Sequence, residues 1–497
     1  MTGGELRTDA PRWPSDDLTP PQGVPWDLLV IGGGSAGIVA AKTAAGFGAS
    51  VLLVERERTG GDCLWTGCVP SKALLTAAHA AAQARSASRY GVDVAGVAVD
   101  FARVMAHVRQ AITAIEPVDS PDTLRATGVR VAHGEAELTG PDTAMVGEIT
   151  VTFRQALLAT GSAPVIPMIP GLAEATSWTS ATIWSLSAAP ERLLVLGGGS
   201  IGCELGQAFA RLGSAVTIVE ATPRLLPRED ADAAGLITAA LTADGVTVRT
   251  GAAVSAVGKV GAGWCAELAD GRAVAFDDVL VAVGRMPRTG GLGLPRAGVS
   301  VDGGGYVRVN RRLQTANPRI WAAGDLTGHP QYTHTAGVHG ALAASNAILG
   351  LRRTTDLATS PRVTFTQPEL AAVGVSAADA VGQRGLTVRT LPHEEVDRAI
   401  AAGRVAGFTR LVLDRRGRVV GATIVGPRAG ESLPEAVLAA RHGLRARDLA
   451  SSVHAYPTYG DGVWKASIAH VQDQLHQPGM RRVVAVAVAA RRRWISR

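Results

Sequence analysis

The chain is poor in cysteine, in aromatic residues and in long apolar runs. Four cysteines in 497 residues are too few for a disulfide-stapled secreted protein, and an aromatic content of 4% offers few stacking platforms for nucleic-acid bases. The longest clean apolar run near the end, Val483 to Ala490, has eight residues, whereas roughly 20 are needed to span a bilayer. Residues 1–25 contain acidic residues and prolines but no apolar secretory-signal core. These absences predict a cytoplasmic protein with a disordered leader at 1–25.

The net charge of +6 is gathered at one end of the chain. Residues 477–497 contain six arginines and no acidic residue, so the remainder is close to neutral. A nucleic-acid partner is therefore not expected. This basic C-terminal tail has two interpretations: weak contact with an anionic membrane surface through its cations, Trp494 and Ile495, or an ordinary solvated helix end.

An internal repeat organises the chain. Residues 30–55 and 195–220 align without a gap and are identical at 11 of 26 positions. Each copy reads as strand, glycine turn, helix and second strand, ending in Glu55 or Glu220, where a carboxylate can accept hydrogen bonds from a ribose. The glycines of the two dinucleotide-binding fingerprints are Gly32, Gly34 and Gly37, and Gly197, Gly199 and Gly202. Their expected roles are a tight turn, close approach of backbone to a pyrophosphate, and helix–strand packing.

Cys63 and Cys68 lie five positions apart in the segment GDCLWTGCVPSK. In a reducing compartment, such a pair is more often catalytic, redox-sensing or metal-binding than structural. A zinc site would need two further ligands at suitable spacing, and the sequence does not supply them. The pattern therefore favours a redox-active dithiol, and no metal is expected. Cys203 and Cys265 stand alone and are expected to be small, buried residues.

In the order and identity of these motifs, residues from about Trp26 to about 475 resemble the class I pyridine nucleotide–disulfide oxidoreductases. This is the flavoprotein family of dihydrolipoyl dehydrogenase, glutathione reductase and mercuric reductase. The resemblance implies an α/β fold with two Rossmann-type dinucleotide-binding domains, for FAD and NAD(P), and a C-terminal α+β dimerisation domain that forms a homodimer. The implied domains are an FAD-binding domain at 26–157 and 286–350, an NAD(P)-binding domain at 158–285, an interface domain at 356–476, and the basic tail at 477–497.

The resemblance also assigns binding roles to residues that match the family's motifs. For FAD these are Gly32, Gly34, Gly37 and Glu55 at the diphosphate and ribose, Lys72 beside the flavin ring, Gly134 on the adenine side, Thr160 and Gly161 in a glycine turn, and Asp325 at the ribitol or pyrophosphate. For the nicotinamide cofactor they are Gly197, Gly199, Gly202, Glu220 and Gly284, with Glu204 near the nicotinamide.

Glu220 favours NADH as the reductant. A carboxylate at this position bonds the free 2′-hydroxyl of NADH and repels the 2′-phosphate of NADPH. Arg224 lies close by in the sequence and leaves NADPH as the alternative.

The resemblance gives the two cysteines different roles. It places Cys68 against the flavin and Cys63 further out, so that electrons pass from the nicotinamide through FAD to a Cys63–Cys68 disulfide. Cys68 would remain as a thiolate, and Cys63 would attack the acceptor. Lys72, in the first turn of the helix that begins near Cys68, supplies the nearby cation that a thiolate needs.

The sequence departs from the disulfide-reducing members at their proton-handling site. Where they carry a histidine before Pro-Thr and a glutamate further on, this chain has Tyr456 and Asp461. A tyrosine, with a pKa near about 10, is a poor base at neutral pH. His454 lies two positions away, on the same side of an extended segment. It is either a replacement base or a hydrogen-bonded histidine on the surface of the interface domain.

Tyr456 and residues 396–414 resemble the mercuric reductase branch, but a second cysteine pair at the end and an N-terminal CxxC domain are missing. The sequence therefore predicts a mercuric reductase-like, FAD-dependent NAD(P)H oxidoreductase that passes electrons to a small acceptor, either a thiophilic metal ion or a quinone. The alternatives are a dihydrolipoyl dehydrogenase-like disulfide reductase with an altered acid–base residue, and a redox-sensing flavoprotein of low turnover.

Overall fold

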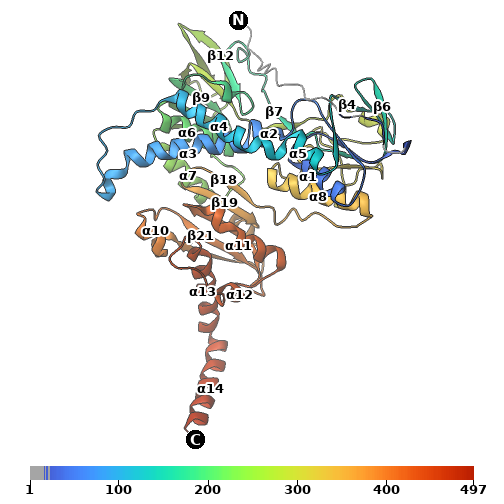
Figure 1. The fold of residues 1–497 in the computed structure, drawn as a ribbon. Helices are drawn as coiled ribbons and strands as arrows, with labels where there is room; N and C mark the ends of the chain where they lie inside the picture. The colour runs from blue at the N-terminus through green and yellow to red at the C-terminus, as the bar shows by residue number, and fades with distance from the viewer. Residues whose placement is uncertain (1–15, 17, 21–22, 497) are drawn as a thin grey trace. The chain divides into compact units, whose positions relative to one another are not determined.

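The computed structural model describes residues 16, 18–20 and 23–496. The chain divides into two compact units (Figure 1). The first contains the described residues up to Pro223 together with Asp244–Leu357, and the second contains Arg224–Ala243 and the described residues from Ala358 onward.

The first unit begins with a seven-stranded sheet in the order β3-β2-β1-β6-β5-β4, with β17 paired to β6. Its strands are β1 (Trp26–Ile31), β2 (Val51–Glu55), β3 (Val129–His133), β4 (Ala136–Leu138), β5 (Thr143–Val146), β6 (Ile149–Leu158) and β17 (Ile320–Ala322). The pairs that join β3, β2, β1, β6 and β17 are parallel. This order places the carboxyl ends of the parallel strands at one edge, where ligands bind in open α/β sheets.

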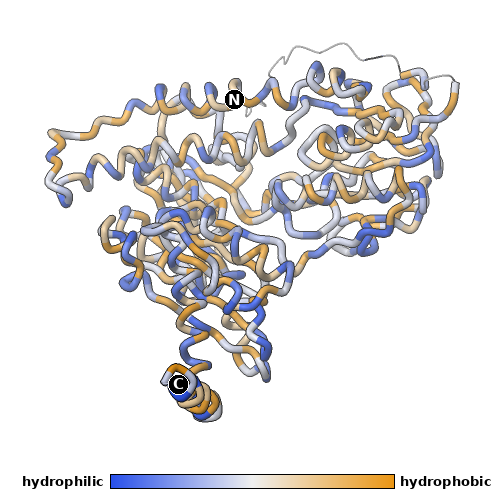
Figure 2. Tube along the Cα trace, turned by 60° about the horizontal axis from the view of Figure 1, so that its bottom comes forward, coloured by the Kyte–Doolittle hydropathy of each residue, from blue (hydrophilic) through white to orange (hydrophobic). Residues whose placement is uncertain are grey.

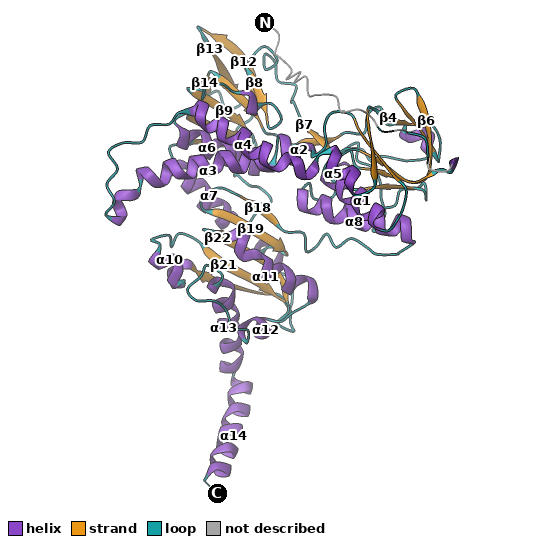
Figure 3. Ribbon diagram, viewed as in Figure 1, coloured by secondary structure: helices purple, strands orange, loops and turns teal. Residues whose placement is uncertain are grey.

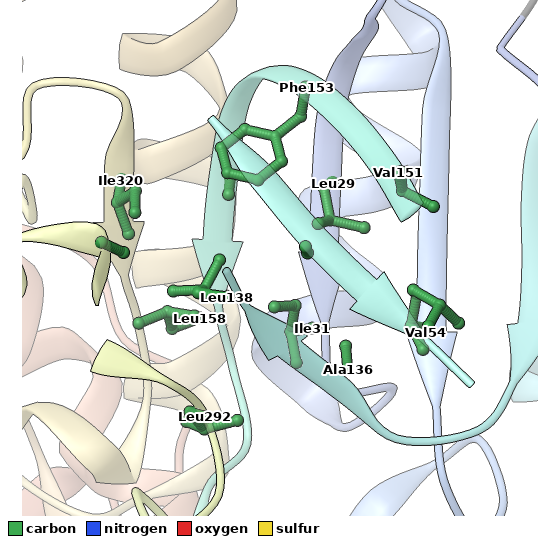
Figure 4. Close-up of a cluster of buried hydrophobic side chains, with 14 of the residues drawn as sticks. Leu29, Ile31, Val54, Ala136, Leu138, Val151, Phe153, Leu158, Leu292 and Ile320 are labelled. Atoms are coloured by element: carbon green, nitrogen blue, oxygen red, sulfur yellow. The ribbon is translucent and has the colours of Figure 1, made fainter. Parts of the chain in front are cut away.

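Both faces of this parallel sheet are covered, which explains the unbroken apolar runs of its strands. Alternate side chains point to opposite faces: Leu29, Ile31 and Phe153 enter one buried cluster (Figure 4), whereas Leu28 and Val30 enter another, with helices α1 (Ser35–Gly46) and α8 (Thr333–Leu349). The other helices of this unit are α2 (Gly61–Trp65), α3 (Cys68–Arg85), α4 (Phe101–Asp119), α5 (Pro121–Ala126) and α6 (Ser200–Leu212).

A second parallel sheet in the same unit follows the order β11-β10-β9-β15-β8. Its strands are β8 (Ser177–Thr179), β9 (Arg192–Leu196), β10 (Ala215–Glu220), β11 (Thr247–Thr250) and β15 (Asp278–Val281). Two antiparallel sheets accompany it: β12 (Val254–Val260), β13 (Gly263–Leu268) and β14 (Ala273–Phe276), and the pair β7 (Ser162–Pro164) and β16 (Arg285–Pro287). The two copies of the repeat thus occupy equivalent positions, β1-α1-β2 and β9-α6-β10.

The second unit is built on an antiparallel sheet in the order β18-β19-β22-β21-β20, flanked by helices (Figure 3). Its strands are β18 (Arg362–Thr364), β19 (Glu369–Gly374), β20 (Thr387–Pro392), β21 (Phe408–Leu413) and β22 (Val419–Gly426). Its helices are α7 (Ala231–Ala243), α9 (Ala377–Ala380), α10 (Asp397–Ala401), α11 (Ala429–His442), α12 (Ala446–Ala450), α13 (Asp461–His476) and α14 (Pro478–Ile495). Two Rossmann-type sheets followed by an α+β unit confirm the predicted fold class.

Helix α7 departs from the expected domain boundaries. The sequence placed it within 158–285, but residues 224–243 belong to the second unit. The Arg410 guanidinium pairs with Asp230 at 3.1 Å and with Asp232 at 2.5 Å. The nearly buried Arg410–Asp230 pair attaches this segment to the antiparallel sheet.

The two ends of the chain also have structure that the sequence did not predict. Most of the expected leader, residues 1–15, 17 and 21–22, lies outside the described residues, but Leu18 is buried and its carbonyl accepts from Trp26 Nε1 at 3.3 Å. Asp16 pairs with Arg125 at 3.0 Å and accepts from Val131 N, so at these positions the chain is held against the first sheet. The basic tail forms helix α14. Among the described helices, none is both long and apolar enough to cross a membrane.

Candidate redox and dinucleotide-binding sites

The two cysteines of the expected redox pair lie on consecutive helices. Cys63 is on the short helix α2, Cys68 is the first residue of α3, and Thr66 and Gly67 join the two helices. The structure has both side chains as free thiols within hydrogen-bonding reach of each other. Cys68 Sγ also contacts Thr333 Oγ1, at the start of α8, at 3.2 Å. The fold therefore brings the pair together in its reduced form.

The two thiols differ in acidity. The hydrogen bond from Cys63 lowers the pKa of Cys68 to about 6; burial opposes this change, whereas the Thr333 hydroxyl and the Lys72 charge assist it. The same hydrogen bond, together with burial, raises the pKa of Cys63. At neutral pH the proton consequently stays on Cys63, and Cys68 is the thiolate.

An ion pair joins the cysteine helix to the helix of the second glycine fingerprint. Lys72 Nζ on α3 lies 2.8 Å from Glu204 Oε2 on α6, and the Glu204 side chain is only 8% exposed. The sequence predicted a site role for each of these residues, and the structure brings the two into direct contact.

The first fingerprint fits an anionic dinucleotide. Gly32 has φ +107°, and a Cβ there would lie 2.5 Å from the Ala159 carbonyl oxygen, while a Cβ on Gly37 would overlap the Gly32 carbonyl oxygen. Only glycine allows this close packing of helix on strand. Helix α1 starts without a side-chain cap and without an acidic residue in its first turn. Neither a side-chain cap nor a carboxylate of that turn therefore competes with a phosphate for the N–H groups at the start of α1.

Glu55 and Gly134 lie at the same edge of the first sheet. Glu55 Oε2 accepts from Gly33 N at 2.7 Å and Oε1 accepts from Glu57 N at 2.8 Å. Burial raises the pKa of Glu55, although these two hydrogen bonds act in the opposite direction. Gly134 N donates to the Glu55 carbonyl at 2.9 Å. The acid therefore braces the glycine loop next to the predicted ribose site.

The second fingerprint repeats this arrangement. A Cβ on Gly202 would overlap the Gly197 carbonyl oxygen, and the position of a Cβ on Gly199 is open. Glu220 Oε2 accepts from Gly198 N at 2.6 Å. Helix α6 likewise starts without a side-chain cap. Gly284 follows β15, and its carbonyl accepts from Val165 N at 3.0 Å.

Asp325 and Thr160 each bond to a residue in or next to the paired strands β7 and β16. Asp325 Oδ2 accepts from Ser162 Oγ at 2.6 Å, and burial raises the pKa of Asp325. Thr160 Oγ1 donates to the Arg288 carbonyl at 2.7 Å. The neighbouring Gly161 carbonyl accepts from Arg288 N at 3.0 Å. All these predicted cofactor residues thus lie in one connected region of the first unit.

Sequence reasoning missed two arginines in this region. Arg285 Nη2 donates to Asp62, the residue before Cys63, and Arg288 Nη1 lies 3.3 Å from the other oxygen of Asp62. The segment VGRMPR shows both arginines, but nothing in the sequence pairs them with an acid so far away in the chain.

Tyr456 lies in the second unit and pairs with an acid that the sequence did not single out. Its hydroxyl donates to Asp397 Oδ2 at 2.8 Å, and Asp397 Oδ1 accepts from Lys465 Nζ at 3.0 Å. This hydrogen bond raises the pKa of Tyr456. Asp461 is fully buried and is directed to Thr458, whose N and Oγ1 lie 3.4 Å from the carboxylate oxygens. The hydroxyl of Tyr456 is therefore paired with Asp397.

His454 is held through both ring nitrogens. Nδ1 lies 3.0 Å from the Ser452 carbonyl and Nε2 lies 2.8 Å from Glu435 Oε1, while the ring stacks on Trp464. Both partners are acceptors. Burial lowers the pKa of His454, but the hydrogen bonds to Glu435 and Ser452 outweigh it and raise the pKa overall. This is the arrangement of a hydrogen-bonded, proton-bearing histidine.

The chain matches family profiles along most of its length. Residues 26–340 match the profile described as pyridine nucleotide-disulphide oxidoreductase, and residues 360–467 match the dimerisation domain of that family. Among the described residues, no group of three or more His, Cys, Asp or Glu side chains is placed to hold a metal ion.

Two relatives are similar over nearly their whole length. A mercuric reductase of Streptomyces lividans is 38% identical over 460 residues, which cover 90% of this chain and 97% of that protein. A dihydrolipoyl dehydrogenase of Thermus scotoductus is 36% identical over 462 residues, which cover 91% and 98%.

Solved structures agree. LpdA from Mycobacterium tuberculosis superposes with a TM-score of 0.81 at 28% identity, covering 89% of this chain and 99% of that one. The HOCl-induced flavoprotein disulfide reductase RclA from Escherichia coli has a TM-score of 0.79 at 27% identity, covering 88% and 98%. The chain belongs to the pyridine nucleotide-disulphide oxidoreductase family and is a homodimeric enzyme that uses FAD and NAD(P)H.

Proposed function

We propose that this enzyme is a mercuric reductase-like oxidoreductase, which passes two electrons from NADH through the Cys63–Cys68 pair to a small thiophilic acceptor. The observation that carries the proposal is the bond from the Tyr456 hydroxyl to Asp397 at 2.8 Å, at the position where disulfide-reducing relatives hold a basic histidine. Mercuric reductases are among the similar proteins.

Bound FAD supplies the two-electron relay between a nicotinamide and a disulfide. The residues proposed to hold it are Gly32, Gly34, Gly37, Glu55, Lys72, Gly134, Thr160, Gly161 and Asp325. Those proposed to hold the nicotinamide cofactor are Gly197, Gly199, Gly202, Glu204, Glu220 and Gly284. Two features of the fingerprints support both assignments. A Cβ on their first or third glycine would overlap backbone atoms, and the helices that follow start without a side-chain cap.

NADH is the proposed reductant. The Glu220 carboxylate is oriented by Gly198 N and by Thr222 N, at 2.6 and 2.8 Å, and it would repel the 2′-phosphate of NADPH. The Arg224 guanidinium already donates to the carbonyls of Leu226 and Pro227, at 2.9 and 2.8 Å. Those bonds engage two of the five guanidinium N–H groups and compete with a phosphate for this side chain.

The different acidities of the two cysteines support different roles for them. Cys68 is the stable thiolate, because its pKa is lowered to about 6. Cys63 holds the proton and gives it up when it binds the acceptor. A soft metal ion such as mercuric ion binds two thiolates and leaves as the neutral metal after gaining two electrons, while NADH becomes NAD⁺. No leaving thiolate needs a proton in this reaction.

The Tyr456 hydroxyl is proposed to stay protonated during turnover, and Asp397 is proposed to hold it in position. Because the bond to Asp397 raises the pKa of Tyr456, the phenol donates a hydrogen bond at neutral pH and cannot take up a proton as histidine does. His454 is a poor substitute, since both of its ring nitrogens face acceptors. Exchange with lipoamide or glutathione disulfide is therefore disfavoured.

The test is an acceptor panel under anaerobic conditions. Purified enzyme is supplied with NADH and, in turn, with mercuric ion, a quinone, lipoamide and glutathione disulfide. We expect turnover with mercuric ion that is abolished by Cys63→Ser and kept by Cys265→Ser, a matched change at a cysteine outside the pair. Faster turnover with lipoamide would overturn the proposal in favour of a dihydrolipoyl dehydrogenase-like enzyme. Quinone turnover unaffected by Cys63→Ser would show that the dithiol is bypassed.

The proposed setting is the cytoplasm, because a pair of reactive thiols is kept reduced there. The proposed partners of the redox site are the second copy of the chain and the small acceptor. Contact of the basic residues 477–497 with a membrane surface is a separate matter, independent of the redox chemistry.

A further inference from the structure

Helix α14 has no packing role in the described structure. All its described side chains are exposed, and it extends away from the antiparallel sheet of the second unit (Figures 1 and 3). It lies beyond residue 467, where the match to the family's dimerisation domain ends. The helix therefore presents a surface that neither the fold nor the family's dimerisation domain accounts for.

The surface of α14 has two chemically different sides. Residues 481–484 read Arg-Arg-Val-Val and residues 492–495 read Arg-Arg-Trp-Ile, so the same pattern recurs after 11 residues. Eleven residues are close to three helical turns, at about 3.6 residues per turn. The two arginine pairs consequently align along one side, and Val483, Val484, Trp494 and Ile495 align along the other.

Residues 485–490, between these ends, are all valine or alanine. Ala487 and Val488 lie on the apolar side with Met480, whereas Val486, Ala485 and Ala489 lie between the arginine pairs, so the arginine side is also apolar in its middle. Helix α14 thus carries both hydrophobic and hydrophilic residues (Figure 2). The apolar side is open: Val483 is 63% exposed, Trp494 67% and Ile495 65%.

The charge and the exposed apolar area of α14 together indicate which kind of partner it binds. The helix contains five arginines and no acidic residue. A nucleic acid would pair with the arginines but leave the apolar side in water. A second copy of the helix could cover the apolar side but would leave the arginines of both copies in water without a counter-charge. A surface with anionic groups above an apolar layer satisfies both sides.

We infer that α14 lies flat on an anionic lipid bilayer, with its apolar side in the acyl boundary and its arginines among the head groups. Eighteen residues make a helix about 27 Å long, and the arginines near both of its ends suit the plane of the surface and not the bilayer interior. Arg491 lies over the Trp494 ring at 4.1 Å, which keeps this cation beside the apolar side, where a long side chain can reach the head groups.

The test is co-sedimentation of the full-length, FAD-loaded dimer with vesicles. One set contains equal parts of phosphatidylglycerol and phosphatidylcholine, and the other contains phosphatidylcholine alone. We expect binding to the anionic set that weakens as salt is added, and little binding to the neutral set. Each arginine near an anionic surface contributes about fivefold in affinity, so the double variant R481Q/R492Q should bind about 30-fold more weakly.

Two further variants test the apolar side of the helix and a general effect of net charge. V483S/W494S removes apolar area without changing charge and should also weaken binding strongly. R384Q/R416Q removes the same charge as R481Q/R492Q from exposed positions elsewhere on the second unit and should bind as the unchanged protein does. Reduction of the flavin by NADH should be equal in all of them, which shows that each variant is folded.

Three results would overturn the inference. The first is no sedimentation of the unchanged protein with anionic vesicles at low salt. The second is equal binding by R481Q/R492Q and R384Q/R416Q. The third is a fall in oligomeric state on V483S/W494S with no change in vesicle binding, which would assign the apolar side to a second copy of the chain.

Discussion

The acidity of Cys68 can be tested by removing the thiol that bonds to it. The hydrogen bond from Cys63 is the largest cause of the lowered pKa of about 6. At pH 7 a thiol with that pKa is about 90% thiolate, whereas an ordinary cysteine with a pKa of about 8.5 is about 3% thiolate. Cys63→Ala should therefore shift the Cys68 titration upward, and a return to the ordinary pKa would reduce the thiolate fraction at neutral pH by about 30-fold.

The assay is the rate at which iodoacetamide modifies Cys68 in the reduced enzyme, followed by mass spectrometry across pH. Cys63→Ser is the matched control, because its hydroxyl can donate in place of the thiol and should leave the titration nearer to that of the unchanged enzyme. Thr333→Val removes the 3.2 Å contact and should raise the pKa by less. An identical titration in Cys63→Ala and the unchanged enzyme would refute this account of Cys68.

Three other predictions concern the fold and the cofactor sites. Glu435→Gln removes the partner that raises the pKa of His454. The raised pKa adds to the free energy of unfolding fully below about pH 6.5, and this stabilisation is lost as pH rises through the folded-state pKa. Urea unfolding of the variant should therefore show a free energy of unfolding lower by about 1 kcal/mol at pH 6 and by less at pH 9. Gly37→Ala should cost about 1–3 kcal/mol and release FAD, measured as flavin retained on gel filtration, whereas Gly46→Ala on the same helix meets no atom and should retain it. Glu220→Ala should weaken NADH binding by about 10- to 100-fold and narrow the preference over NADPH, measured as the two kcat/KM values; an unchanged ratio would mean that Glu220 does not read the ribose.

The parts of the fold that the sequence predicted are those with local causes. The strand–glycine–helix units at Gly32 and Gly197 follow from residues within one βαβ segment, because a Cβ on Gly37 or Gly202 meets backbone only five residues earlier. The C-terminal α+β domain, by contrast, was expected only from the resemblance to the family.

The contacts that shape the site could not be predicted because they join distant segments. Lys72 and Glu204 are 132 positions apart, and Cys68 and Thr333 are 265 apart. Their pairing depends on how whole helices pack, and no local pattern records that. The sequence shows that Tyr456 stands in place of a histidine. It could not predict the bond from the Tyr456 hydroxyl to Asp397, 59 positions away, for the same reason.

The position of segment 224–243 also depends on distant contacts. The resemblance implied that this segment belongs to the NAD(P)-binding domain at 158–285. The ion pairs of Arg410 with Asp230 and Asp232 join it to the antiparallel unit instead. A nearly buried charge pair of this kind is visible only when both partners are placed in space.

The central claim is that electrons from NADH reach Cys63 and Cys68. The direct measurement is site-resolved alkylation of the oxidised, FAD-loaded enzyme before and after anaerobic addition of NADH. The account predicts a Cys63–Cys68 cross-linked peptide beforehand, and two newly alkylated residues, Cys63 and Cys68, afterwards. Bleaching of the flavin by NADH with no change in the alkylation of either cysteine would contradict it.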